Sequence, residues 1–121
     1  PIAIMLNNLQ KALPQLGVSQ ADIIYEIPAE GGITRMLAVY DDISKAGQIG
    51  PIRSDRTFFN SIAKSFDAAI VHCGGSVRGR NGYHDISGSK ITDWAHLDAT
   101  TYEGKDFFRD YDRCYRLLQL R

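Results

Sequence analysis

A helical stripe of apolar residues, set between apolar runs of strand length, constrains the fold of this chain more than any other feature. Residues recurring at the three- and four-residue spacing of one helix face are Phe58, Phe59, Ile62, Ala63 and Phe66. Ser54 can cap the start of such a helix with its hydroxyl, and Asp55 is favourable at the positive end of the helix dipole. The pattern therefore predicts a helix over residues 54–66, with Phe58, Phe59, Ile62 and Phe66 mostly buried.

The apolar runs around this helix have the length and β-branched content of strands. They cover residues 2–6, 21–27, 33–40 and 68–73. A helix between two strands is typical of a crossover that makes the strands parallel. We therefore predict one domain of the α/β (or α+β) class, a mixed sheet with residues 54–66 as a crossover helix and residues 68–73 as an internal strand. Residues 21–27 and 33–40 can form a hairpin.

Local patterns assign the other segments less distinctly. The spacing of apolar residues after residue 8 permits one helical turn. The segment GQIGP at residues 47–51 contains residues that are common in turns, which predicts a turn there. Residues 77–89 contain several glycines and polar side chains, which indicates a loop. Residues 91–97 can form a short helix capped by Thr92, and the spacing of apolar residues favours a second helix over residues 105–120.

Composition excludes several classes of protein. Lys and Arg number 14, as do Asp and Glu, so the chain lacks the basic excess of a protein that binds nucleic acid through bulk charge. His72, His84 and His96 match no metal-binding spacing, and Cys73 and Cys114 are too few for a disulfide framework. We expect neither a metal nor a cofactor, and no nucleic-acid partner.

The segment GPIRSDR at residues 50–56 is the first candidate site. The first N–H groups of a helix attract anions, and Arg53, Ser54 and Arg56 lie beside the predicted helix start. Guanidinium groups bind carboxylates and phosphates through paired hydrogen bonds. The alternative is a structural role, in which both arginines form salt bridges with Glu26, Glu30 or Asp55.

The segment HCGGS is the second candidate site, because ligands of open α/β sheets bind beyond the carboxyl ends of parallel strands. Amides of Gly74, Gly75 and Ser76 could form an anion-binding nest. His72 is either a catalytic group or a hydrogen-bonded core histidine. We predict that Arg53, Arg56 and this turn face one cleft, where backbone amides and guanidiniums hold an anion.

Two carboxylates flank the turn before Gly31 and Gly32. Glu26 and Glu30 could serve as a general acid and base. A strand carboxylate that is buried needs a partner, and we expect Arg35 on the following strand to pair with Glu26. A structural ion pair is the alternative to catalysis.

The strings ADIIYE, EGGITR and GPIRSDR, followed by AAIVHCGGS, resemble the N-terminal domain of the YerB-type lipoprotein family of Gram-positive bacteria, whose function is unknown. The family positions present here are Glu26, Glu30, Gly31, Gly32, Thr34, Arg35, Gly50, Pro51, Arg53, Ser54, Arg56, His72, Gly74, Gly75 and Ser76.

The resemblance implies that residues 1–121 form one domain of a longer exported protein, held at the outer face of the cell membrane by a lipid anchor and followed by a second domain, neither of which is in this sequence. Two departures are the segment SVRGRNGYHDISGS after residue 75 and the ending DRCYRLLQLR, where the family usually has a His-Asn segment. A site that uses that segment would be incomplete here.

Three functions are consistent with these residues. The first is a non-enzymatic extracellular domain that binds an anionic small molecule or cell-envelope polymer. The second is a hydrolase of envelope material that uses Glu26 or Glu30 with His72. The third is a scaffold for another protein. Convergence of Glu26, Arg35 and the arginines of the helix start on an open site favours the first two, and closed ion pairs favour the third.

Overall fold

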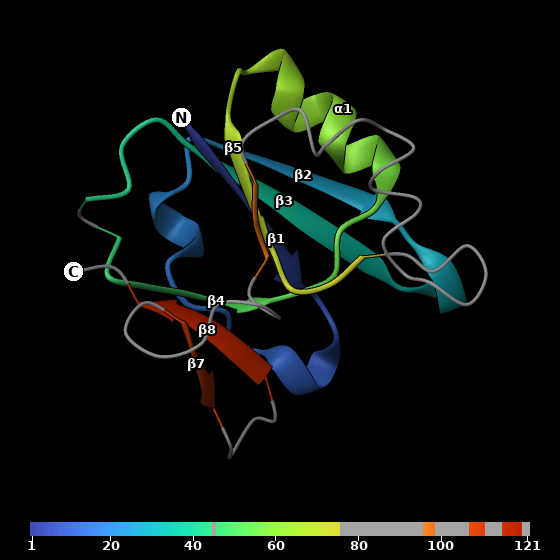
Figure 1. The fold of residues 1–121 in the computed structure, drawn as a ribbon. Helices are drawn as coiled ribbons and strands as arrows, with labels where there is room; N and C mark the ends of the chain where they lie inside the picture. The colour runs from blue at the N-terminus through green and yellow to red at the C-terminus, as the bar shows by residue number, and fades with distance from the viewer. Residues whose placement is uncertain (45, 76–95, 99–106, 111–114, 120–121) are drawn as a thin grey trace.

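A mixed β-sheet with an α-helix on one of its faces forms the body of the domain (Figure 1). The structure is a computed structural model that describes residues 1–44, 46–75, 96–98, 107–110 and 115–119. The strands are β1 (Ile2–Asn7), β2 (Ile23–Pro28), β3 (Thr34–Tyr40), β4 (Gln48–Ile52), β5 (Ala69–His72), β6 (His96–Asp98), β7 (Phe107–Asp110) and β8 (Tyr115–Gln119). The helix is α1 (Thr57–Ser65), and the short 3-10 turns are η1 (Gln10–Ala12), η2 (Val18–Gln20) and η3 (Glu30–Gly32).

The central strand β1 organises the sheet. It pairs antiparallel with β3 along one side, and β2 continues the sheet as the antiparallel partner of β3. On its other side, β1 pairs in parallel with β5 near its start and antiparallel with β4 at Leu6. β5 is flanked by β1 and β6, whereas β8 and β7 extend the sheet from β4. The mixed α+β fold predicted from the sequence is thus confirmed, with residues 69–72 as an internal strand.

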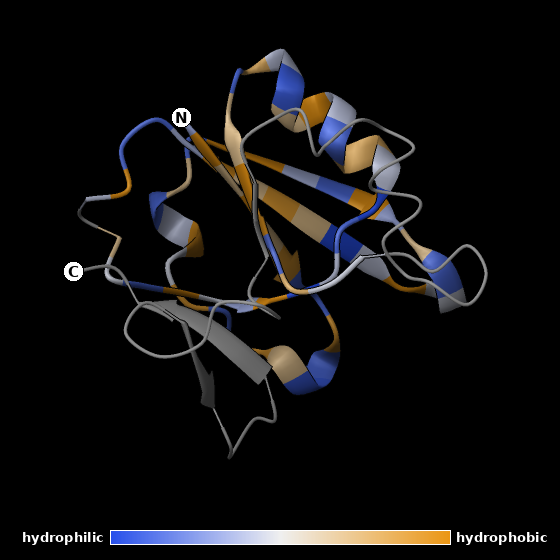
Figure 2. Ribbon diagram, viewed as in Figure 1, coloured by the Kyte–Doolittle hydropathy of each residue, from blue (hydrophilic) through white to orange (hydrophobic). Residues whose placement is uncertain are grey.

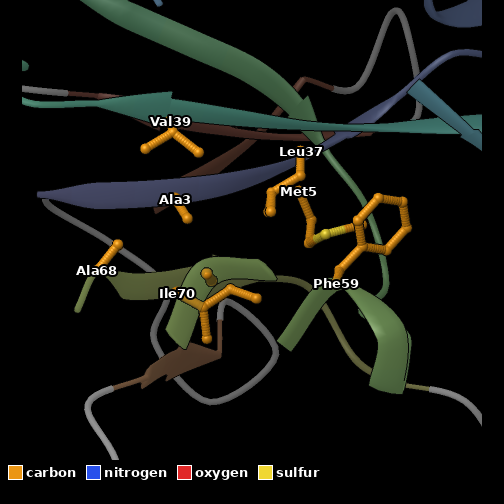
Figure 3. Close-up of a cluster of buried hydrophobic side chains, with 8 residues drawn as sticks. Ala3, Met5, Leu37, Val39, Phe59, Ala68 and Ile70 are labelled. Carbon is orange, nitrogen blue, oxygen red and sulfur yellow. The ribbon is translucent and has the colours of Figure 1, made fainter. Parts of the chain in front are cut away.

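Each face of the sheet has its own core. The helix face buries Ala3, Met5, Leu37, Val39, Phe59, Ala63, Ala68 and Ile70 (Figure 3). The other face buries Ile4, Leu6, Ala38, Tyr40, Ile49, Ile52 and Val71. Because successive strand residues point to opposite faces, strands apolar at every position are those covered on both sides. Figure 2 shows this concentration of hydrophobic residues on the central strands.

The predicted helix exists, with a different start and a narrower buried face. It begins at Thr57 after Arg56, with no side-chain cap, so the prediction of Ser54 as the capping residue is wrong. Phe59 is fully buried, but Phe58 is 40% exposed because it lies to the side of the face that meets the sheet. Within the part of the chain that the structure describes, no helix is long and apolar enough to cross a membrane.

Three other predictions are corrected by long-range pairing. The GQIGP segment is strand β4 rather than a turn, since Leu16 and β8 supply its hydrogen-bond partners. β4 runs antiparallel to β1, so the parallel partner of β5 is β1 and not the strand that leads into the helix. β7 and β8 pair antiparallel where the local spacing of apolar residues favoured a helix over 105–120, and residues 96–98 form β6 where a short helix over 91–97 was an option. The polar loop predicted at 77–89 lies outside the described residues.

Candidate functional site

One end of the sheet brings together Glu30 and the three arginines among the candidate residues, but not Glu26. β1 ends there at Asn7, β5 ends at His72, β3 begins there, and the segment that links β4 to α1 crosses it. Figure 2 shows that this linking segment is hydrophilic. Backbone hydrogen bonds hold the segment in place, among them those from Arg53 N–H to Met5 O at 2.9 Å and from Cys73 N–H to Arg53 O at 3.0 Å.

Arg35 is the most deeply buried arginine of this end, with 2% of its surface exposed. It lies on the helix face, directly opposite Asn7 in the β1–β3 register. Its Nη1 donates to the carbonyl of Ser54 at 2.8 Å, and its Nη2 lies 2.5 Å from Oε1 of Glu30. Burial, followed by the positive charges of Arg56 and Arg53, lowers the pKa of Arg35 to about 10, which leaves it charged at neutral pH.

Glu30 joins two of the arginines. Its Oε2 accepts a hydrogen bond from Arg56 Nε at 3.1 Å, and its Oε1 accepts one from Arg56 Nη2 as well as the bond from Arg35. The hydrogen bonds from Arg56 are the largest cause that lowers the pKa of Glu30 to about 2. The Glu30 side chain nevertheless remains 56% exposed.

Asp55, expected from the sequence to act at the helix dipole or as a salt-bridge partner of the arginines, is a buried carboxyl group. It is fully buried, and its backbone N–H donates to Gly74 O at 2.9 Å. Burial raises the pKa of Asp55 to about 7, against hydrogen bonds from the Arg56 backbone and Asn60 that favour the ionised form. An Asp before a predicted helix has an ordinary role near the dipole, so no local signal marked this one as buried.

Four buried polar atoms at this end have no hydrogen-bond partner among the described residues. They are Asn7 Nδ2, Arg35 Nε, Arg53 Nε and Asp55 Oδ2. Buried donors and acceptors are nearly always paired with protein, ordered water or ligand. Three of the four are donors, two of them on guanidinium groups. We call Arg35, Arg53 and Arg56 the arginine cluster.

The nest of Gly74, Gly75 and Ser76 amides stays a prediction, but the bonds around it are defined. The Cys73 amide already bonds to Arg53 O, and Gly74 presents its carbonyl to Asp55 N–H and, at 2.9 Å, to Nδ1 of His72. A carbonyl only accepts, so His72 carries its proton on Nδ1, as a hydrogen-bonded core histidine does. Gly75 follows directly, and Ser76 lies outside the described residues.

Glu26 is absent from this arrangement. It accepts hydrogen bonds from Thr34 Oγ1 at 2.6 Å and from Asn8 Nδ2 at 3.0 Å. The expected pairing of Glu26 with Arg35 is wrong, because Glu30 takes that place. Among the described residues, no three His, Cys, Asp or Glu side chains gather as a metal site would require.

Comparison with known proteins places the chain in a family. Residues 1–116 match the family described as "Protein of unknown function (DUF3048) N-terminal domain". The chain belongs to this family. It is 45% identical over 76 residues to the Bacillus subtilis (strain 168) protein named "Putative lipoprotein YerB", an alignment that covers 63% of this chain and 23% of YerB.

The fold of this family member is also similar to a solved structure. The crystal structure of YerB from Bacillus subtilis matches 98% of this chain with a TM-score of 0.81 and 30% sequence identity. The matched part is 39% of the YerB chain in that crystal structure, so this chain spans well under half of that relative. The resemblance inferred from the sequence motifs is confirmed.

Proposed function

We propose that this domain is a non-enzymatic binding module whose arginine cluster holds an anionic group of a cell-envelope component. The observation that carries the proposal is a set of buried guanidinium donors that have no partner within the described part of the chain, Nε of Arg35 and Nε of Arg53. A buried charge is costly unless it is paired, so these groups favour an anion that completes their hydrogen bonds.

The charge balance of the site supports an anion rather than a cation. The site has three guanidiniums and one carboxylate, Glu30, that is ionised at neutral pH and pairs with Arg35 and Arg56. Burial raises the pKa of the second carboxyl, Asp55, to about 7, which weakens its negative charge at neutral pH. The cluster therefore has an excess of more than one positive charge, located where the field is strengthened by low dielectric surroundings.

The name of its relative supports a location at the cell envelope. The relative carries the name "Putative lipoprotein YerB", and a lipid anchor would hold such a domain against the outer face of the cytoplasmic membrane. Anionic polymers and peptide carboxylates of the envelope would then be the available ligands.

The hydrolase alternative has less support. The hydrogen bonds of Glu30 hold its pKa near 2, too low for a general acid or base at neutral pH. Glu26 lies on the sheet face opposite Arg35, whereas His72 alternates with Val71 and so shares the helix face with Ile70. The second candidate is a protein-binding scaffold, favoured by the closed Glu30 ion pairs and by Ile23 and Ile24 of strand β2, each 40% exposed.

Calorimetric titration of the protein with inorganic phosphate and with N-acetyl-dialanine, a small peptide carboxylate, tests the proposal. We expect saturable binding of at least one probe, weakened by added salt and lost in Arg53→Gln. Lys64→Gln is the matched control, because Lys64 is an exposed cation in the last turn of α1. Binding lost equally in both variants, or no binding of either probe by the wild-type protein, would overturn the proposal.

A further inference from the structure

The bonding of Glu30 deepens this proposal, on which the present inference rests. Its two carboxylate oxygens meet the Nε and Nη2 donors of Arg56 in the paired geometry by which a guanidinium binds a planar carboxylate. The same Oε1 also meets Arg35 Nη2. The arginine cluster thus already contains a bound carboxylate, and that carboxylate belongs to the protein.

We infer that the ligand of this site is itself a carboxylate, and that Glu30 occupies the position which the ligand's carboxylate takes when it binds. Exchange of one carboxylate for another preserves the charge and the paired hydrogen bonds of Arg56. The ligand would add what Glu30 leaves unmet, bonds to the buried Nε groups of Arg35 and Arg53.

Glu30 is placed so that it can leave without disturbing the sheet. Its side chain is 56% exposed, and it lies in η3, outside the β2–β3 pairing that ends at Pro28 and Thr34. Gly31 and Gly32 follow it, both exposed, and neither has an atom within 4 Å of the Cβ position. The chain on either side is joined by a bond from Ala29 N–H to Ile33 O at 2.8 Å, which closes the turn independently of the Glu30 side chain.

While Glu30 occupies the site, the ligand cannot bind there. The apparent affinity for the ligand is therefore reduced in proportion to the fraction of molecules in which Glu30 is bound. Glu30→Gln keeps the size of the side chain and removes its charge, which weakens this competition. We expect N-acetyl-dialanine to bind Glu30→Gln about fivefold more tightly, or better, than it binds the wild-type protein, in the range usual for coupling between groups of one protein. N-acetyl-dialanine amide, which has no carboxylate, should bind neither.

Glu26→Gln is the matched control. It removes the same charge from the same hairpin but from the opposite face, where Glu26 accepts hydrogen bonds from Thr34 and Asn8. We expect its affinity for the probe to equal that of the wild-type protein. An equal gain in both variants would attribute the effect to overall charge and overturn the inference.

A second measurement covers the case in which Glu30→Gln does not fold. In the wild-type protein, the carboxylate ¹³C resonance of Glu30 should move towards that of a solvated glutamate as N-acetyl-dialanine saturates the site. Probe binding with that resonance unmoved overturns the inference and leaves the anion-binding proposal standing. If inorganic phosphate binds more tightly than the peptide carboxylate, the inference that the ligand is a carboxylate is overturned. If neither the wild-type protein nor any variant binds a probe, both the anion-binding proposal and this inference are overturned.

Discussion

Glu26 and Arg35 lie on neighbouring strands of one hairpin but point to opposite faces of the sheet. Arg35 is opposite Ile27 in the register of β2 and β3, whereas Glu26 is opposite Met36. Directly opposed residues share a face and successive residues alternate, so Glu26 and Arg35 cannot meet across the strands. The turn between the two strands instead places Glu30 beside Arg35. Glu30 therefore contacts the arginine cluster, whereas Glu26 does not.

The stability of the domain should depend on Arg35 through its bond to the Ser54 carbonyl and its ion pair. Arg35→Met keeps most of the volume and leaves the Ser54 carbonyl without this donor. Because Glu30 is exposed and can return to water, we expect a loss of only about 1–3 kcal/mol in the free energy of unfolding. Urea unfolding measures this loss. A loss above that of Phe59→Ala would contradict the view that Arg35 serves binding more than folding.

Asp55 should make stability depend on pH. Its folded pKa of about 7 is above the ordinary value of 3.8, so the folded state binds this proton more tightly than the unfolded state. The contribution of Asp55 to the free energy of unfolding is therefore largest below pH 3.8. It falls as the pH rises to about 7 and stays constant at higher pH. Asp55→Asn imitates the protonated form, and we expect it to be more stable than the wild-type protein above pH 7, by a few kcal/mol at most.

The matched control for Asp55 is Asp67→Asn at the exposed end of α1. Asp67 has a φ of 52°, a conformation that Asn also tolerates. Urea unfolding at several pH values should show the slope between pH 4 and 7 reduced in Asp55→Asn and retained in Asp67→Asn. A slope that is the same in both variants would contradict the burial of Asp55 as its cause.

Phe58 and Phe59 provide a direct test of how α1 packs. Phe59 is fully buried against Met5 and Leu37, whereas Phe58 is 40% exposed. We expect Phe59→Ala to lower the free energy of unfolding by about 3–5 kcal/mol and Phe58→Ala by about 1 kcal/mol or less. Equal losses in denaturant unfolding would mean that α1 presents a different face to the sheet.

Gly17 and Gly31 form a second matched pair, since both have a φ of 72°. A Cβ at Gly17 would lie 2.7 Å from both Gln48 O and Ile49 Cγ1, whereas one at Gly31 would meet nothing within 4 Å. Gly31→Ala should therefore cost about 1–2 kcal/mol for the backbone conformation alone. Gly17→Ala should cost about 1–3 kcal/mol more, because β4 has to move. Thermal unfolding of both variants measures the difference.

The sequence predicted the parts of this fold that depend on local hydrophobic pattern. Continuous apolar runs such as IAIML and AIVH mark strands covered on both faces, and they are β1 and β5. β4 was missed because Gly50 and Pro51 are common in turns, and its strand conformation depends on Leu16 and β8, which are distant in sequence. The spacing of apolar residues in 107–119 fits a helix locally, but pairing of β8 with β4 selects a hairpin.

The candidate site was predictable only in part, for the same reason. Arg56 paired with Glu30 was one of the alternatives open from the sequence, and the structure contains that pair. The burial of Asp55 and the place of Asn7 depend on how β1, β3 and the segment after β4 meet, which no local pattern describes. Strand alternation was the available signal against pairing Glu26 with Arg35.

The central claim is that the arginine cluster binds an anion. The NMR resonances of the arginine Nε–Hε groups test it most directly, because Nε of Arg35 and Nε of Arg53 have no partner among the described residues. In a ¹⁵N-edited NMR titration of the wild-type protein with N-acetyl-dialanine, we expect both resonances to shift and saturate with one common affinity, while the amide of the same peptide leaves them unmoved. Unshifted Nε–Hε resonances of Arg35 and Arg53 at saturating peptide would contradict the account.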